Sequence, residues 1–87
     1  MTFLESLSEE KRLAARIHEI TKDHPLRELE ADYLAEAVLE SQGRGGIVTN
    51  RERALERYVA IVDWLECTGR ISPAERSELL ALPRRWA

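Results

Sequence analysis

Apolar residues in this chain recur at spacings of three and four positions in four separate segments. In the first segment, residues 2–22, they are Leu4, Leu7, Leu13, Ile17 and Ile20. This spacing places side chains on one face of an α-helix. The helix is expected to begin with a capping box at Thr2 or at Ser6. Nowhere does a period of two persist long enough to predict a sheet. The pattern therefore predicts an all-α protein.

The second segment, about 25–42, is expected to begin at Pro25, because proline suits the first position of a helix. Gly43 is expected to end it. On a helical wheel, one side carries Leu26, Leu29, Tyr33, Leu34 and Ala37. The other side carries Glu28, Asp32, Glu36 and Leu39. We therefore expect an acidic outward face on which Leu39 is an exposed apolar residue.

The third and fourth segments complete the predicted bundle. Apolar residues cover more than half the circumference of the third, about 50–67, which is typical of a central helix or of one that also forms an oligomer interface. The fourth, about 73–82, has a clear start, with Ser72 as the cap, Pro73 at the first position and Glu75 at the third. Pro83 is expected to end it. We expect one domain over residues 1–87, a compact four-helix bundle with a short last helix.

The composition excludes several classes of protein. The chain has 87 residues, 44% of them hydrophobic and 33% charged, which is ordinary for a folded domain. Its single cysteine, Cys67, cannot form an internal disulfide, and no Cys/His cluster has the spacing of a zinc site. No run approaches the ~20 apolar residues of a membrane span, and the start of the chain lacks a signal-peptide pattern. We expect a cytoplasmic protein, from a bacterium or a phage-infected cell, without metal or cofactor.

No group of residues has the spacing of an active site. The loop 43–46 is rich in glycine and could offer N–H groups to an anion, but it lacks the Lys-Ser/Thr ending of a phosphate-binding loop. We interpret it as a helix end and a connector. His18 and His24 lack the spacing of a helical metal pair and have no fixed acidic partner, so we interpret them as surface or capping residues. Cys67 is interpreted as a packing residue. The sequence therefore predicts a protein that is not an enzyme.

Charge is distributed unevenly along the chain. Five acidic residues and no basic one lie between Glu28 and Glu40, whereas four arginines and two glutamates lie between Arg44 and Arg57. This segregation predicts two electrostatically distinct surfaces, although solubilising faces would give the same pattern. Trp86 lies beside two arginines and either anchors a partner or folds back onto the core. The predicted partner-binding residues are Glu28, Asp32, Glu36, Leu39, Arg44, Arg51, Arg53, Arg57, Arg84, Arg85 and Trp86.

One stretch resembles a known family. Residues 62–80, in which Gly69-Arg70-Ile71-Ser72 joins an apolar helix to a short helix ending in leucines, resemble the first two helices of a winged helix-turn-helix. In that family a recognition helix enters the major groove of DNA. It would follow Leu82, where only Pro83 to Ala87 remain, so the resemblance implies related helix architecture and assigns no DNA-binding residues.

These features favour a small protein-interaction module that occupies a surface of a larger protein or complex, as a regulator or inhibitor does. Phages and mobile elements encode proteins of this class, anti-CRISPR proteins among them, although no motif here identifies that group. The loop after the second helix, with its flanking arginines, is the expected contact. One alternative is a nucleic-acid-contacting accessory protein that uses the arginines against phosphates, although the net charge of −3 counts against it. A second alternative is a homo-oligomeric module, such as a homodimer through the third helix.

Overall fold

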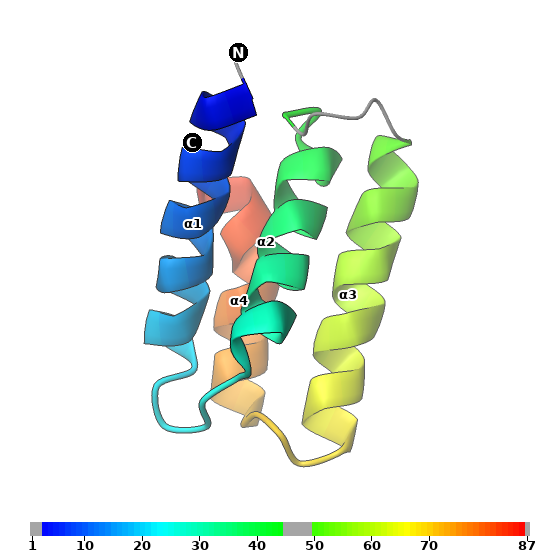
Figure 1. The fold of residues 1–87 in the computed structure, drawn as a ribbon. Helices are drawn as coiled ribbons and strands as arrows, with labels where there is room; N and C mark the ends of the chain where they lie inside the picture. The colour runs from blue at the N-terminus through cyan, green and yellow to red at the C-terminus, as the bar shows by residue number, and fades with distance from the viewer. Residues whose placement is uncertain (1–2, 45–49, 87) are drawn as a thin grey trace.

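The computed structural model describes residues 3–44 and 50–86, over which four helices form a bundle (Figure 1). They are α1 (Phe3–Ile20), α2 (Glu28–Ser41), α3 (Arg51–Cys67) and α4 (Pro73–Arg85). No strand occurs in these two stretches, so the predicted all-α four-helix fold is confirmed. Thr2 and residues 45–49, which include most of the predicted glycine loop, lie outside the described residues. None of the described helices combines the length and the apolar run that a membrane span needs.

The central helix is α2. It packs against α1 on one side and α3 on the other, and it also contacts α4 (Figure 1). Its buried face includes three alanines, whose small side chains let the neighbouring helices approach closely: Ala31, Ala35 and Ala37. The central position is therefore held by α2, and of the two interpretations of the third helix only the oligomer interface stays a prediction. The apolar circumference of α3 is wide because Leu55 and Trp64 remain exposed on opposite flanks.

One hydrophobic cluster joins all four helices. Leu34 and Val38 of α2 lie in it with side chains from every other helix. These are Leu13 and Ile17 from α1, Tyr58, Val62 and Leu65 from α3, and Leu79 and Leu82 from α4. The bundle is thus held by burial of apolar area shared among the helices, which is the dominant stabilising term for a domain of this size.

The first connection is longer than the sequence predicts. Helix α1 ends at Ile20, where the buried Thr21 hydroxyl donates to the Ile17 carbonyl at 2.9 Å. Helix α2 begins at Glu28 and not at Pro25. The backbone stays extended at Arg27, whose N–H donates to the Glu30 carboxylate at 2.8 Å. This start leaves Leu26 free to insert into the core from the loop.

Helices α2 and α3 end in the same way. Gly43 and Gly69 adopt positive φ values of 72° and 74°. After each glycine, an arginine N–H returns to the helix at 2.8 Å, from Arg44 to Leu39 and from Arg70 to Leu65. This is the Schellman ending, which glycine favours because it has no Cβ. The prediction of Gly43 as a helix end is confirmed.

Helix α4 begins as predicted but ends later. The Ser72 hydroxyl accepts from the Glu75 N–H at 3.2 Å, and the Glu75 carboxylate accepts from the Ser72 N–H at 2.7 Å. The expected end at Pro83 is wrong, because the helix continues to Arg85. Proline removes only one backbone donor, and the last turn of a helix tolerates this when the orphaned carbonyl finds another partner.

Candidate protein-binding site

Two of the arginines that the sequence predicts to form a basic surface are used in ion pairs within the chain. Arg44 pairs with Glu9 of α1 and also donates to the Gln42 side chain at 3.2 Å. Arg57 pairs with Glu40 of α2 at 2.7 Å. Both guanidinium groups therefore have carboxylates already opposite them, and both fix the position of a helix. This reduces the positive potential that they offer to an external partner.

The remaining predicted arginines do not form one surface. Arg51 and Arg53 are exposed in the first turn of α3, and the Arg51 guanidinium lies close to Gly43. Arg84 and Arg85 are exposed in the last turn of α4, where they line a separate groove. The structure thus separates Arg53, which lines a pocket with Arg57 and Glu40, from Arg84 and Arg85 at the end of α4.

Two predicted anchors are less accessible than expected. Leu39 is only 3% exposed, because α2 is covered by neighbours on more than one side, so its placement on an exposed face is wrong. Trp86 folds back: its ring packs against the core and its indole N–H donates to Glu9 at 3.2 Å. The guanidinium of Arg12 lies 5.8 Å from the centre of the Trp86 ring. Of the two interpretations of Trp86, closure of the core fits the structure.

The acidic face of α2 is partly neutralised. Glu30 accepts two hydrogen bonds from Arg70, at 2.7 and 3.0 Å, and this pairing lowers the pKa of Glu30. Glu40 is buried and bound to Arg57. Glu28 and Glu36 are exposed and Asp32 is half-buried, as an outward acidic face requires.

Three carboxylates form what we call the acidic ridge: Glu10 of α1 with Asp32 and Glu36 of α2. Partial burial and then the charge of Asp32 raise the pKa of Glu10. Partial burial, followed by the neighbouring Glu40 and the charge of Glu10, raises the pKa of Glu36. Like charges close together disfavour ionisation in this way. The ridge therefore carries concentrated negative charge, and sequence reasoning missed Glu10 because it comes from another helix.

An apolar hollow lies at the surface between α2 and α3. It has a volume of about 440 Å³, and apolar side chains of α2 and α3 form nearly all of its lining. Leu29 is 81% exposed, Tyr33 47% and Trp64 55%. The only charged lining residue is Glu30, which Arg70 already occupies. The lining consists of Leu29, Glu30, Tyr33, Leu34, Ile61, Trp64 and Leu65.

This hollow has the character of a protein-binding surface. Exposed apolar residues scattered singly are normal, whereas a contiguous patch with tyrosine and tryptophan is typical of an interface centre. The guanidinium of Arg57 lies 5.4 Å from the centre of the Tyr33 ring and holds that ring at the edge of the hollow. The sequence pattern predicted Leu29 and Tyr33 on the buried side of the helix, which is wrong because both lie at the open surface between α2 and α3, where they line the hollow with Trp64.

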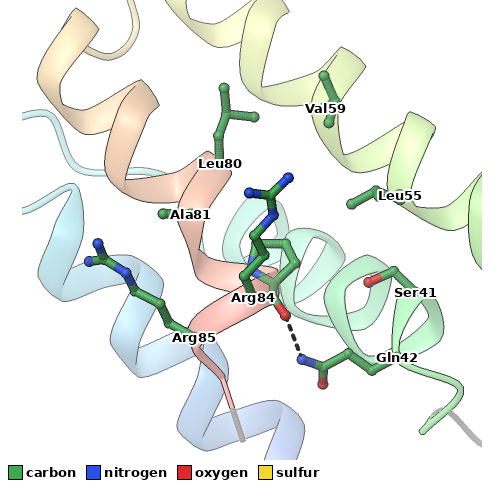
Figure 2. Close-up of a pocket in the computed structure, with 9 residues that line it drawn as sticks. Ser41, Gln42, Leu55, Val59, Leu80, Ala81, Arg84 and Arg85 are labelled. Carbon is green, nitrogen blue, oxygen red and sulfur yellow. Dashed lines mark hydrogen bonds between the residues drawn. The ribbon is translucent and has the colours of Figure 1, made fainter.

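A second groove runs between the end of α2, α3 and α4 (Figure 2). Its volume is about 690 Å³. We call it the arginine groove; its lining consists of Ser41, Gln42, Leu55, Val59, Leu80, Ala81, Pro83, Arg84 and Arg85. The Gln42 amide donates to the backbone carbonyls of Pro83 and Trp86, at 2.9 and 2.8 Å, and so ties the end of α4 to the end of α2.

Two further candidate side chains are His24, in the α1–α2 loop, and Cys67, at the end of α3. His24 Nδ1 lies 2.7 Å from the buried Glu75 carboxylate, so the expectation that it has no fixed acidic partner is wrong. This contact joins the α1–α2 loop to the start of α4. Cys67 is exposed and does not pack into the core. No described group of three or more His, Cys, Asp or Glu side chains is arranged to hold a metal ion.

Comparison of the chain with protein-family models, curated proteins and solved structures gave no match. The resemblance of residues 62–80 to a winged helix-turn-helix therefore rests on that stretch alone.

Proposed function

We propose that this protein is a small, non-enzymatic interaction module that binds a larger protein or complex through the apolar hollow and the acidic ridge. The observation that carries the proposal is the exposure of Leu29, Tyr33 and Trp64 around one hollow. Full burial of a large apolar side chain gains about 1.5–3 kcal/mol, and each of these side chains forgoes the part of that gain that belongs to its exposed surface. A partner that covers them would recover this free energy.

The charges beside the hollow define the chemistry of the partner. Leu29 lies one helical turn from both Asp32 and Tyr33, so apolar and acidic side chains adjoin on one exposed face. Arg57 and Arg70, two cations near the hollow, are each paired with a glutamate. Arg27 lies close enough to Glu30 of the lining for its charge to help lower the pKa of that carboxyl group. A partner segment with apolar side chains for the hollow and lysines or arginines for the ridge is complementary to this face.

Regulators and inhibitors of larger complexes work by such occupation of a surface. Phage and mobile-element proteins, including anti-CRISPR proteins, are examples of the class, and a cytoplasmic location belongs to the same proposal. The ion pairs of Arg44 and Arg57 make the nucleic-acid alternative weaker, because two of its six arginines face carboxylates. A homodimer that covers the hollow would use α3, as the oligomer alternative requires.

Site-specific photocrosslinking in the producing cells tests the proposal. A benzophenone side chain at position 33 lies at the hollow, and one at the exposed position 15 on α1 is the control. We expect a crosslinked partner at position 33 that is absent at position 15 and is lost in the Leu29→Ser and Trp64→Ser variants. Crosslinks equal at the two positions would overturn the proposal, and crosslinks only to other copies of this chain would replace it with the homodimer.

A further inference from the structure

The arginine groove has an apolar floor and a cationic edge. Leu55 and Val59 of α3 face Leu80 of α4, and Arg84 lies between these two helices (Figure 2). Leu55 is 44% exposed although it adjoins the core helices. The groove therefore presents apolar surface that nothing in the described chain covers.

The charged groups of this groove are the guanidinium groups of Arg84 and Arg85, which are hydrogen-bond donors. Arg84 and Arg85 form no ion pair with any described residue, in contrast to Arg44 and Arg57. No carboxylate occurs in the lining. The backbone carbonyl of Pro83, in the wall of the groove, already accepts a hydrogen bond from the Gln42 amide. The Arg84 side chain projects between α3 and α4, whereas Arg85 points to the other side of α4, where it also lines a pocket with Glu78 (Figure 2). A carboxylate is the group that a guanidinium group without an ion-pair partner binds best.

We propose that the arginine groove is a second docking surface, one that binds an acidic amphipathic segment of a partner protein. Its apolar side chains would cover Leu55, Val59 and Leu80, and a carboxylate would bind Arg84. The preference in charge is opposite to that of the hollow, where the acidic ridge favours a basic segment. The protein would then be a connector between two partner segments of opposite charge.

The two surfaces are far enough apart to be occupied together. Leu55 in the groove and Trp64 in the hollow are nine positions apart on α3, a rotation of about 180° at 3.6 residues per turn. They therefore lie on opposite flanks of the helix, one facing α4 and the other α2. Because the rigid bundle separates them, a segment on one flank leaves the other accessible.

Two synthetic helical peptides test this proposal on the intact protein. They share the same leucine positions, and one carries glutamate where the other carries lysine. We expect the Leu/Glu peptide to shift backbone amide resonances of residues around Leu55, Leu80 and Arg84, with binding that weakens as salt is added. The Leu/Lys peptide should instead shift those around Leu29 and Tyr33. Failure of the Leu/Lys peptide alone would count against the proposed function, whereas failure of the Leu/Glu peptide, or its binding at the hollow, would overturn the second surface.

Charge-reversal variants separate a specific surface from general attraction. Arg84→Glu/Arg85→Glu should weaken binding of the Leu/Glu peptide by about tenfold or more. Lys11→Glu/Lys22→Glu makes the same change in net charge at exposed positions outside the groove and should leave the affinity within about twofold. Leu55→Ser tests the apolar floor without altering the end of α4, and it should also weaken binding. Equal losses in the two charge-reversal variants would mean that only net charge matters.

Discussion

The hydroxyl of Tyr58 on α3 donates a hydrogen bond of 2.5 Å to the backbone carbonyl of Leu79 on α4. In a regular helix this carbonyl would accept from the N–H four residues later, which at Pro83 does not exist. Tyr58 is fully buried, and burial raises its pKa. The tyrosine therefore supplies the donor that proline removes, and this explains how α4 continues past Pro83.

Replacement of Tyr58 by phenylalanine should destabilise the fold by about 1–3 kcal/mol, because the Leu79 carbonyl is then buried without a partner. In a Pro83→Ala background the restored N–H can donate to that carbonyl, so the same change should cost less than about 1 kcal/mol. Chemical denaturation of the four proteins of this cycle measures the coupling. If Tyr58→Phe lowers the free energy of unfolding equally with proline and with alanine at position 83, the Tyr58 hydroxyl does not replace the missing N–H.

Enlargement of the buried alanine stripe should also destabilise the bundle. Ala35 has no exposed surface and lies on the central helix, so Ala35→Leu should lower the free energy of unfolding by about 1–3 kcal/mol through overpacking. Ala15→Leu makes the same chemical change at an exposed position of α1 and should alter stability by less than about 0.5 kcal/mol. Thermal unfolding of both variants provides the comparison, and similar losses would show that α2 is not closely packed.

The acidic ridge should make stability depend on pH. Partial burial and Glu40 raise the pKa of Glu36 in the folded protein, so the folded state binds its proton more tightly than the unfolded state. The resulting stability is present below the ordinary pKa of 4.5 and is lost as pH rises through the raised value. Glu36→Gln should therefore stabilise the protein at pH 7, by about 0.2–0.5 kcal/mol for a like-charged pair on a helix surface.

This gain should disappear in acid, where the wild-type carboxyl is protonated. The control is Glu28→Gln, which removes a charge at the start of α2, where the helix dipole favours an anion. This variant should show no gain at pH 7. Thermal unfolding between pH 3 and pH 8 follows both proteins, and a gain for Glu36→Gln that persists at pH 3 would contradict repulsion as its cause.

The two glycine helix ends offer a matched pair of substitutions. Gly43→Ala and Gly69→Ala should each cost about 1–2 kcal/mol, because alanine is strained at positive φ. A Cβ at Gly43 would clash with the guanidinium group of Arg51, whereas the space at Gly69 is open. Since the tip of an arginine side chain moves easily, the two costs should agree closely. A much larger loss at Gly43, relieved by Arg51→Ala, would mean that Arg51 is held in place.

The helices could be predicted from the sequence because their signals are local. Spacing of apolar residues, the Ser72 capping box and Gly43 as a helix end all depend on neighbours within one or two turns. The errors at Pro25 and Pro83 arise from distant partners. Leu26 inserts into a core that other helices build, and Pro83 is tolerated because Tyr58, 25 positions earlier, reaches Leu79.

The candidate site was harder to predict, because a helical wheel does not show which face a neighbouring helix covers. Leu29 and Leu39 are both leucines on α2, yet one is exposed and the other is buried. The most deeply buried face of α2 was not apparent from the sequence, because alanine carries little hydrophobic signal. Its alanines are Ala31, Ala35 and Ala37. Ion pairs such as that of Arg44 with Glu9 join positions 35 residues apart, and the uneven charge pattern gave no indication of them.

The residues of α2 that pack the core and those that form its outward surface are separate sets. One set of positions, the alanines with Leu34 and Val38, determines how closely the helices approach. Another set, with Leu29, Asp32, Tyr33 and Glu36, faces outward and contributes little to the core. Substitutions in the outward set can therefore change the choice of partner while the fold persists. The same backbone is thus suited to evolve new specificities, or to be given them in the laboratory.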